Sequence, residues 1–235
     1  MKKVLIGCPT FEGYEYCLQA FASRITTLTY SNYEVLIADN SATDVYTKKI
    51  QSFGINTIST PHHPDVKQRI VASRNALRAA FLAGDYDYFL SIEQDIIPPY
   101  NVIEQLIRHE QDAVSGIYYK IYKVKAQDKA GNIRIVNTLL PVVFTFADTE
   151  EKMNKCYPKE VEGSKFFRIR AAGLGCMMIS RKALEAIPFK HIPGQDTFDD
   201  FLFCGDLYAH GFTLYTDTTV KCKHLFLKKG NVFKQ

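Results

Sequence analysis

The chain has 235 residues, 46% of them hydrophobic, and a formal net charge of +4. This content supports one sizeable core and excludes a largely disordered chain. The longest apolar stretches have the length of strands, which excludes a membrane-spanning helix. Gly7, Cys8 and Pro9 interrupt the first apolar run before it reaches the length of a signal peptide. We therefore expect a soluble, cytoplasmic protein.

Strands and helices alternate through the first half of the sequence. Short Val-, Leu- and Ile-rich runs predict strands at 4–7, 34–38, 55–59 and 88–92. Amphipathic spacing predicts helices at 14–28, from about 43, at 67–83 and at 100–109. Repeated βα units of this kind predict an α/β fold with a mostly parallel central sheet flanked by helices.

The pattern changes near residue 112. Residues 114–124 and 133–146 are predicted to be extended and partly antiparallel, joined by turn residues at 128–132. After a polar stretch at 148–164, we expect strands at 166–169 and 176–179, a short helix from 181, a helix at 197–210 and an extended run at 220–227. Neither a repeat nor a linker divides the sequence, so we expect one domain over 1–235, with a smaller antiparallel portion in its second half.

Cysteines and basic residues add two further observations. The six cysteines form no CxxC pair and several lie in apolar runs, so we interpret them as reduced structural residues. Cys222 and His224 could form half of a zinc site, but a second pair is absent from the sequence. Basic residues are concentrated at 120–134 and after Asp217, where they form either a solvated face or a surface for a polyanion.

Two acids follow the apolar run at 88–92 directly, in the sequence Glu93-Gln94-Asp95. The carboxyl ends of parallel strands form the edge of the sheet at which ligands bind. Carboxylate oxygens there suit a hard divalent cation, which in turn suits a diphosphate. Acids at a strand end can instead cap the following helix, and of the two we take Asp95 as the better candidate for a metal ligand.

Polar residues at two other positions also have two readings each. Asp39, with Asn40 and Ser41, could accept hydrogen bonds from a base or ribose, or could cap the next helix. Arg74 lies within the apolar stripe of its helix, where a charge is costly unless it is paired. It either forms a structural ion pair or reaches a phosphate or base carbonyl, and we favour contact with the ligand.

Three segments in the second half are further candidates. Gly173-Leu174-Gly175 is a loop that either lets the backbone approach a ligand or makes a tight bend. Asp199 and Asp200 open a helix, where they favour the helix dipole or supply a general base. His224 is either structural or a cation ligand, and no other histidine has a comparable case.

Taken in order, these segments resemble the GT-A glycosyltransferases, in particular the family 2-like group. The resemblance covers nearly the whole chain and rests on the segments 8–12, 39–41, 72–75, 92–95, 172–176, 199–200 with 211–212, and His224. It implies a nucleotide-diphospho-sugar transferase fold, with residues 1–111 forming the nucleotide-binding half and 112–235 the acceptor-binding and catalytic half. It also implies transfer of a sugar from a nucleoside-diphosphate donor, UDP being the commoner, to a hydroxyl acceptor.

The resemblance assigns a role to each matching residue. The nucleotide would be bound by Thr10, Phe11, Glu12, Asp39, Asn40, Arg74, Asn75, Glu93 and Gln94. The family's DxD motif corresponds to 93–95, so that Asp95, with His224, would bind Mn²⁺ or Mg²⁺. The loop formed by Gly173, Leu174 and Gly175 would lie by donor and acceptor. Asp199 and Asp200 match the family's catalytic pair, with Asp200 as the base of an inverting reaction.

The sequence departs from the family pattern at positions 93 and 199 and in the helix after Asp200, which carries Gly205-Asp206 and lacks the Arg often seen there. Other readings stay open. Glu93 replaces the first Asp of DxD and Asp199 replaces a Glu. A nucleotidyltransferase would need a Gly-rich loop with a Lys or Arg after the first strand, which the sequence lacks at that position. A non-catalytic nucleotide- or carbohydrate-binding module and a retaining transferase are further alternatives. The acceptor could be a saccharide, lipid or protein, with a modified nucleic-acid base as a minor alternative.

Overall fold

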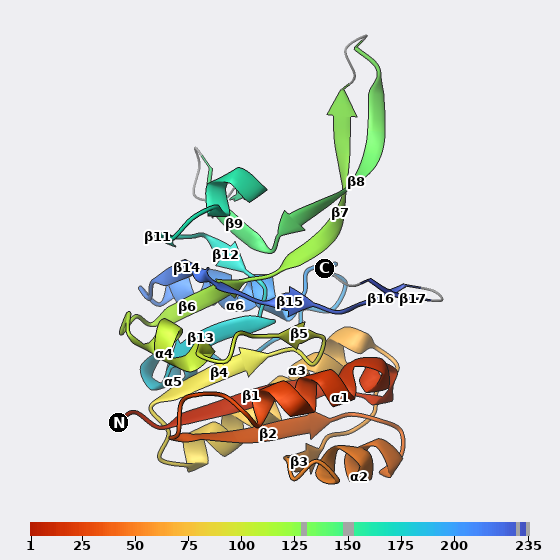
Figure 1. Ribbon diagram of the computed structural model, residues 1–235, viewed down its shortest axis with the longest axis vertical. Helices are drawn as coiled ribbons and strands as arrows, with labels where there is room; N and C mark the ends of the chain where they lie inside the picture. Colours follow the sequence, from red (N-terminus) through yellow and green to blue (C-terminus); the bar gives the residue numbers. More distant parts are fainter. Residues whose placement is uncertain (128–130, 148–152, 229–230, 234–235) are drawn as a thin grey trace.

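The computed structural model describes residues 1–127, 131–147, 153–228 and 231–233. Its central sheet contains β1 (Val4–Thr10), β2 (Tyr33–Asp39), β3 (Asn56–Ser59), β4 (Tyr88–Ile92), β6 (Ala113–Ile117), β11 (Phe166–Arg168), β13 (Cys176–Ser180) and β14 (Leu214–Lys221). The strands lie in the order β11-β14-β6-β13-β4-β1-β2-β3 (Figure 1). Only β13 and β11 pair antiparallel to their neighbours. The predicted mostly parallel α/β sheet is therefore confirmed, and it takes strands from both halves of the chain.

Helices cover both faces of this sheet (Figure 1). They are α1 (Glu15–Ile25), α2 (Val45–Gln51), α3 (Val66–Ala83), α4 (Val102–Ile107), α5 (Arg181–Ala186) and α6 (Asp199–Ala209), with 3-10 turns η1 (Glu12–Tyr14) and η2 (Pro158–Val161). The long helix α3 is capped by Asp65, whose side chain accepts a hydrogen bond from the Lys67 backbone N–H. Its Leu77 and Phe81 are fully buried, so burial of this apolar stripe fixes α3 against the sheet.

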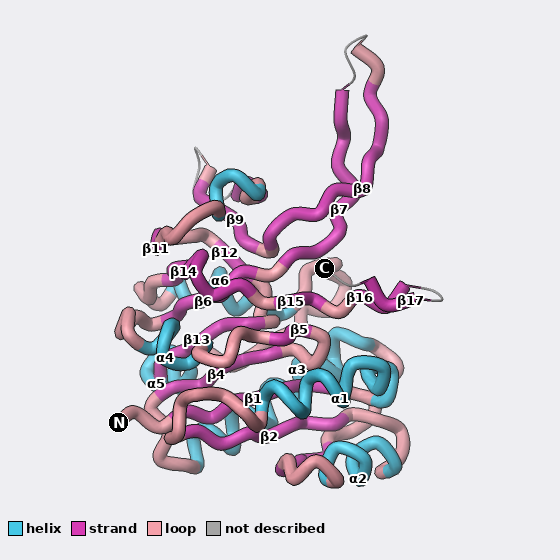
Figure 2. The backbone as a smooth tube through the Cα atoms, viewed as in Figure 1, coloured by secondary structure: helices cyan, strands magenta, loops and turns pink. Residues whose placement is uncertain are grey.

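Smaller sheets surround the central one. They are β5 (Ile96–Ile97) with β15 (Lys223–His224), β9 (Val143–Phe146) with β10 (Met153–Lys155) and β12 (Ala171–Ala172), β16 (Phe226–Lys228) with β17 (Asn231–Phe233), and β7 (Tyr119–Gln127) with β8 (Ile133–Pro141). The β7–β8 hairpin projects beyond the rest of the molecule (Figures 1 and 2). The expected turn at 128–132 and the polar stretch at 148–164 fall partly outside the described residues.

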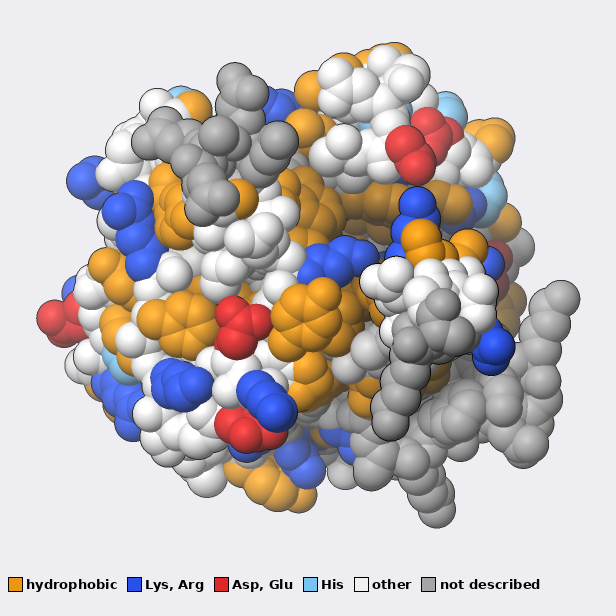
Figure 3. Space-filling view, turned by 90° about the horizontal axis from the view of Figure 1, so that it is seen from above, with side chains coloured by type: hydrophobic (Ala, Val, Ile, Leu, Met, Phe, Trp, Pro, Cys, Tyr) orange, Lys and Arg blue, Asp and Glu red, His pale blue; other side chains and the backbone are white. Residues whose placement is uncertain are grey.

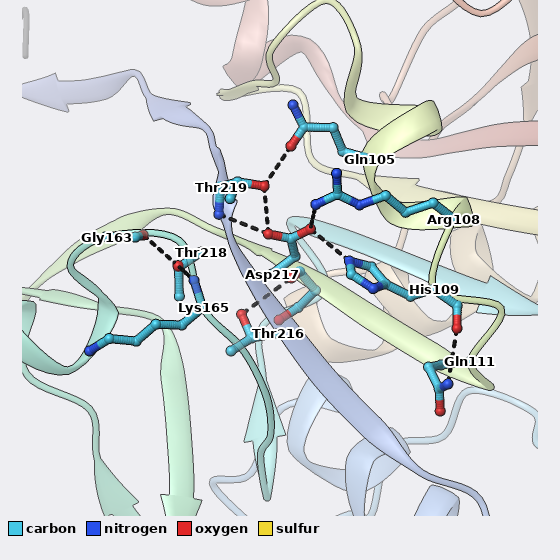
Figure 4. Close-up of polar contacts among 11 residues, drawn as sticks. Gln105, Arg108, His109, Gln111, Gly163, Lys165, Thr216, Asp217, Thr218 and Thr219 are labelled. Atoms are coloured by element: carbon cyan, nitrogen blue, oxygen red, sulfur yellow. Dashed lines mark hydrogen bonds and ion pairs between the residues drawn. The ribbon is translucent and has the colours of Figure 1, made fainter.

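The strand β14 is the main element that the sequence prediction missed. We expected one extended run at 220–227, whereas β14 begins at Leu214 and the chain after Lys221 forms the separate strands β15 and β16. Asp217 is buried within β14. Its carboxylate accepts hydrogen bonds from His109 (2.7 Å), Arg108 (3.0 Å) and the Thr219 backbone N–H (2.8 Å; Figure 4). These partners make a buried charge tolerable in a strand.

Two expectations from composition can be compared with the structure. All six cysteines are free and buried, as we expected of structural thiols. Within the described part of the chain, the helices are too short or too polar to cross a lipid bilayer.

Candidate active site

The parallel strands end at one edge of the sheet, and most candidate residues lie there. Thr10 ends β1, Asp39 ends β2, and Glu93 follows β4 directly. A pocket opens at this edge between the strand ends and α3, and it is lined by Pro9, Thr10, Phe11, Tyr14, Asn40, Val66, Arg69, Ile70, Arg74, Glu93 and Gln94. Six candidate residues from the first half of the sequence therefore line one pocket: Thr10, Phe11, Asn40, Arg74, Glu93 and Gln94.

Asp95 and His224 are brought together by the pairing of β5 with β15. His224 lies opposite Ile96 in this ladder, and the Leu225 backbone N–H donates to the Asp95 carbonyl at 2.8 Å. As a result, Nε2 of His224 lies 3.0 Å from Oδ2 of Asp95, although the two residues are 129 positions apart in the sequence. The spatial convergence that the metal-site hypothesis requires is therefore present.

The chemistry of this pair suits a divalent cation. Nδ1 of His224 lies 2.7 Å from the carbonyl oxygen of Tyr119 and must donate to it, because a carbonyl only accepts. Nε2 therefore faces Asp95 either with a second proton or with a lone pair available to a metal ion. Burial lowers the pKa of His224, but Asp95 outweighs this effect and the net pKa is raised. The other oxygen of Asp95, Oδ1, is buried without a hydrogen-bond partner.

Two ligands do not complete a metal site. Among the described residues, groups of three or more His, Cys, Asp or Glu side chains suited to a metal ion are absent. The donor set of Asp95 and His224 thus fits a cation whose remaining ligands come from a bound molecule or water.

Arg74 is buried and all three of its guanidinium nitrogens contact protein groups. Nη1 donates to the Ser91 hydroxyl at 2.8 Å, Nη2 to Glu93 at 2.8 Å, and Nε lies 2.7 Å from Asp199. The structural ion pair that we considered less favoured from the sequence is therefore present. Because Glu93 and Asp199 come from opposite halves of the chain, Arg74 connects the strand end after β4 to the first turn of α6.

Glu93 and Gln94 point in different directions. Burial raises the pKa of Glu93, and nearby Asp95 adds to this effect while Arg74 opposes it. Gln94 is buried on the other side of the chain. Its carbonyl oxygen accepts from the Thr10 hydroxyl, and its amide nitrogen donates to the Tyr14 carbonyl at 2.9 Å and to the Tyr46 hydroxyl at 2.6 Å. The polar atoms of the Gln94 side chain thus hold Thr10, Tyr14 and Tyr46 in position beside the pocket.

The carboxylate of Asp39 is engaged by the segment that follows it, but it does not cap α2, whose N-cap residue is Asp44. One carboxylate oxygen of Asp39 accepts from the backbone N–H (2.9 Å) and hydroxyl (2.6 Å) of Ser41, and the other accepts from the Thr47 hydroxyl (2.6 Å). Asn40 differs, because its Nδ2 donates to Ser73 while its Oδ1 is buried without a partner. Asn40 therefore has an acceptor oxygen that is available to a ligand, whereas both carboxylate oxygens of Asp39 already accept hydrogen bonds.

Glu12 and Asn75 are candidates that lie outside the residues lining this pocket. Glu12 is exposed in η1, and its backbone N–H donates to the Ser41 hydroxyl at 2.8 Å. Asn75 is turned away on α3. Its amide exchanges two hydrogen bonds with the backbone of Phe189, at 2.8 Å and 3.0 Å. This pairing fixes the segment that leads toward α6.

The two acids at the start of α6 have different surroundings. Asp199 is buried and its carboxylate faces Arg74. Asp200 is half-buried and accepts a hydrogen bond from the Phe201 backbone N–H at 2.8 Å. Burial, together with the adjacent charge of Asp199, raises the pKa of Asp200 to about 6. A carboxyl group with this pKa is suited to take a proton near neutral pH.

The glycine loop is shaped by Tyr118, a residue that sequence reasoning missed. A Cβ atom at Gly173 would lie 1.9 Å from the Tyr118 hydroxyl oxygen, and one at Gly175 would lie 2.8 Å from its ring. Leu174 between them is fully buried, and its carbonyl accepts from Ser91. The close approach expected of this loop is thus made to a protein side chain. The proximity of Tyr118 could not be foreseen, because it follows only from the neighbouring positions of β6 and β13.

Arg69 and Lys120 are two further basic residues that sequence reasoning missed. Arg69 lines the pocket, with its guanidinium 5.3 Å from the centre of the Phe11 ring. It follows Val66 and precedes Ile70 and Arg74 on the same side of α3, so continuing the helical stripe toward the N-terminus could have identified it. The charge of Lys120, at the start of β7, acts on Asp200 and lowers its pKa.

A mostly parallel open α/β sheet flanked by helices, with a pocket at its strand ends, is the architecture of a class of transferase, the GT-A fold. A family model described as glycosyl transferase family 2 matches residues 6–187. The chain therefore belongs to glycosyl transferase family 2 and is a glycosyltransferase. A search of the curated proteins finds no match.

Solved structures show the same fold at low sequence identity. GalNAc-T7 with UDP, GalNAc and Mn²⁺ has a TM-score of 0.63 at 12% identity, covering 98% of this chain and 45% of that chain. The mannosyltransferase PcManGT from Pyrobaculum calidifontis, in complex with GDP-Man and Mn²⁺, has a TM-score of 0.62 at 13% identity, covering 97% and 58%. A197 from STIV has a TM-score of 0.51 at 18% identity, covering 96% and 86%. This chain thus spans about half the length of the first two.

Proposed function

We propose that the protein transfers a sugar from a nucleoside-diphosphate donor, UDP being the first choice, to an acceptor hydroxyl with inversion at the anomeric carbon. The observation that carries this proposal is the pairing of Asp95 with His224 at 3.0 Å beside the pocket. An imidazole and a carboxylate with an unbonded oxygen provide two ligands for Mn²⁺ or Mg²⁺. Two structures of the same fold were solved with Mn²⁺ and a nucleotide, which supports this cofactor.

The nucleotide would occupy the pocket between the end of β1 and α3. Asn40 Oδ1 would accept a base N–H, and the Phe11 ring offers an apolar contact. Two arginines line the pocket. Arg74 forms ion pairs with Glu93 and Asp199, so Arg69 is the one that we expect to contact the diphosphate. The bound cation would supply positive charge to the departing diphosphate.

Asp200 would act as the general base. Its carboxylate would take the proton of the acceptor hydroxyl while that oxygen attacks the anomeric carbon and the diphosphate departs from the opposite face. Lys120 lies near enough to lower the pKa of Asp200, which favours the ionised base. Asp199 would hold Arg74 in place and take no part in proton transfer.

Calorimetry with UDP and GDP, each with Mn²⁺ or with EDTA, tests the donor and cation sites. We expect nucleotide binding that requires the cation, weakened about 10- to 100-fold in His224→Gln and in Asp95→Asn. His210→Gln is the matched control, because His210 is exposed at the end of α6 and its Nδ1 contacts only a backbone carbonyl of its own helix. Nucleotide affinity that is equal in EDTA and in both site variants would contradict the proposal.

A further inference from the structure

The β7–β8 hairpin, residues 119–127 and 133–141, forms an arm that extends away from the sheet (Figure 1). Nine residue pairs join its two strands, from Tyr119 with Pro141 to Gln127 with Ile133. A two-stranded ribbon alone is marginally stable in water, because it lacks a third layer to bury its apolar side chains. The length of this arm therefore suggests that it meets another surface.

One face of the arm carries exposed branched apolar side chains. Directly paired residues of an antiparallel ladder share a face, and the pairs Ile121–Leu139, Lys125–Ile135 and Gln127–Ile133 lie on the same side. Ile133 and Ile135 are 68% and 69% exposed, and Ile121 and Leu139 are also exposed. We call this side the outer face of the arm.

The opposite face turns toward the catalytic residues at its root. Leu140 is buried there, and the ring of Tyr122 lies 4.4 Å from the Lys155 ammonium. Burial and the charge of Asp200 raise the pKa of Tyr122, and the charge of Lys120 lowers the pKa of Asp200. Viewed from above, the surface beside the arm is hollowed, with hydrophobic, Lys and Arg side chains in the hollow (Figure 3). The root of this face thus lies near Asp200, whereas the outer face is exposed.

The charge of the arm is strongly one-sided. Residues 119–141 contain four Lys and one Arg against a single acid, Asp128. Lys123 and Lys125 are exposed on the outer face among the isoleucines. Lys221 and Lys223 are exposed near the root of the arm, where His224 contacts Tyr119. A partner that matches the outer face would therefore need negative charge for the lysines and an apolar region for the isoleucine and leucine side chains.

We propose that the outer face of the β7–β8 arm docks on an anionic lipid bilayer. Isoleucine and leucine side chains enter the boundary between headgroups and acyl chains, while the lysines meet the anionic headgroups. Pairing of two such arms would bring like charges together, which disfavours a second copy of this chain. A polynucleotide would be expected to stack on aromatic rings, whereas the exposed apolar side chains of the outer face are isoleucine and leucine. The proposal concerns a surface outside the donor pocket and does not depend on the donor.

The absence of tryptophan from the sequence allows a direct test. Ile135→Trp places a single fluorophore on the outer face, and Val45→Trp places one at a site 70% exposed on α2, at the opposite end of the molecule (Figure 1). Both full-length variants are titrated with vesicles of phosphatidylcholine and with vesicles that also contain phosphatidylglycerol. We expect a blue shift for Ile135→Trp with the anionic vesicles only, and none for Val45→Trp.

Co-sedimentation of otherwise native protein with the same vesicles provides a second measurement. Lys125→Glu should weaken binding to anionic vesicles about tenfold, because it replaces one favourable charge by a repulsive one. Lys48→Glu on α2, also exposed, should leave it unchanged. The proposal is overturned if the emission maximum of Ile135→Trp is unchanged by vesicles or changes only with an oligonucleotide. A shift with protein concentration alone would indicate self-association and would overturn it as well.

Discussion

Asp200→Asn should separate catalysis from folding, because the ionised carboxylate serves the reaction at a cost to stability. The pKa of Asp200 is raised to about 6 from an ordinary value of 3.8. At about 1.4 kcal/mol for each tenfold change, this difference corresponds to about 3 kcal/mol. Because solvent reaches part of the side chain, we expect Asp200→Asn to raise the free energy of unfolding at neutral pH by about 1–3 kcal/mol. The asparagine oxygen can still accept the Phe201 backbone N–H.

The pH dependence fixes the sign of this effect. Below pH 3.8 the carboxyl group is protonated in both folded and unfolded chains, so wild type and variant should be equally stable. As pH rises toward 6 the unfolded chain ionises first, and the wild type loses stability relative to the variant. Above pH 6 the difference is constant. Activity of the wild type should rise over the same approach to pH 6, because the base must be ionised.

Urea unfolding of the ligand-free protein at several pH values measures the stability, and release of nucleoside diphosphate measures the activity. We expect Asp200→Asn to lower activity by about 10²–10⁴-fold while leaving nucleotide affinity unchanged. Asp199→Asn is the matched control at the adjacent position. It removes a buried partner of Arg74 and should cost about 3 kcal/mol of stability. Parallel loss of stability and nucleotide affinity in Asp200→Asn would show that Asp200 is a structural cap, and would refute this reasoning.

Three further predictions concern other parts of the molecule. Gly173→Ala should lower the melting temperature and the activity together, because the added methyl group meets the Tyr118 hydroxyl; an unchanged protein would contradict this packing. Arg69→Ala should weaken nucleotide binding about tenfold without changing urea unfolding, as expected of a half-buried ligand contact. Asp217→Asn should cost about 2 kcal/mol at neutral pH. Burial alone would raise the pKa of Asp217, but hydrogen bonds from His109, Thr219 and Arg108 lower it below 3.8. The stability cost of the substitution should therefore shrink as the pH falls below 3.8, and a cost that stays constant would show that the charge of Asp217 is not responsible for it.

Sequence reasoning succeeded where a local pattern has one physical outcome. Apolar runs followed by polar residues, as at 88–95, require a buried strand that ends at the edge of the sheet, so the parallel α/β fold and the position of Glu93 could be predicted. It missed β14, a strand that contains the buried charge of Asp217, which partners distant in the sequence make tolerable.

The sequence by itself determined the alternating strands and helices of the first half, the edge at which polar residues gather and the family to which the chain belongs. The tertiary structure decided, for two pairs of neighbouring polar side chains, which one is bound to other protein groups and which one remains available to a ligand or substrate. Asp199 is held by Arg74 while Asp200 is not, and Asp39 is used by its own loop while Asn40 keeps an open acceptor. Such choices depend on contacts between residues far apart in the chain, whose free energy no local pattern records.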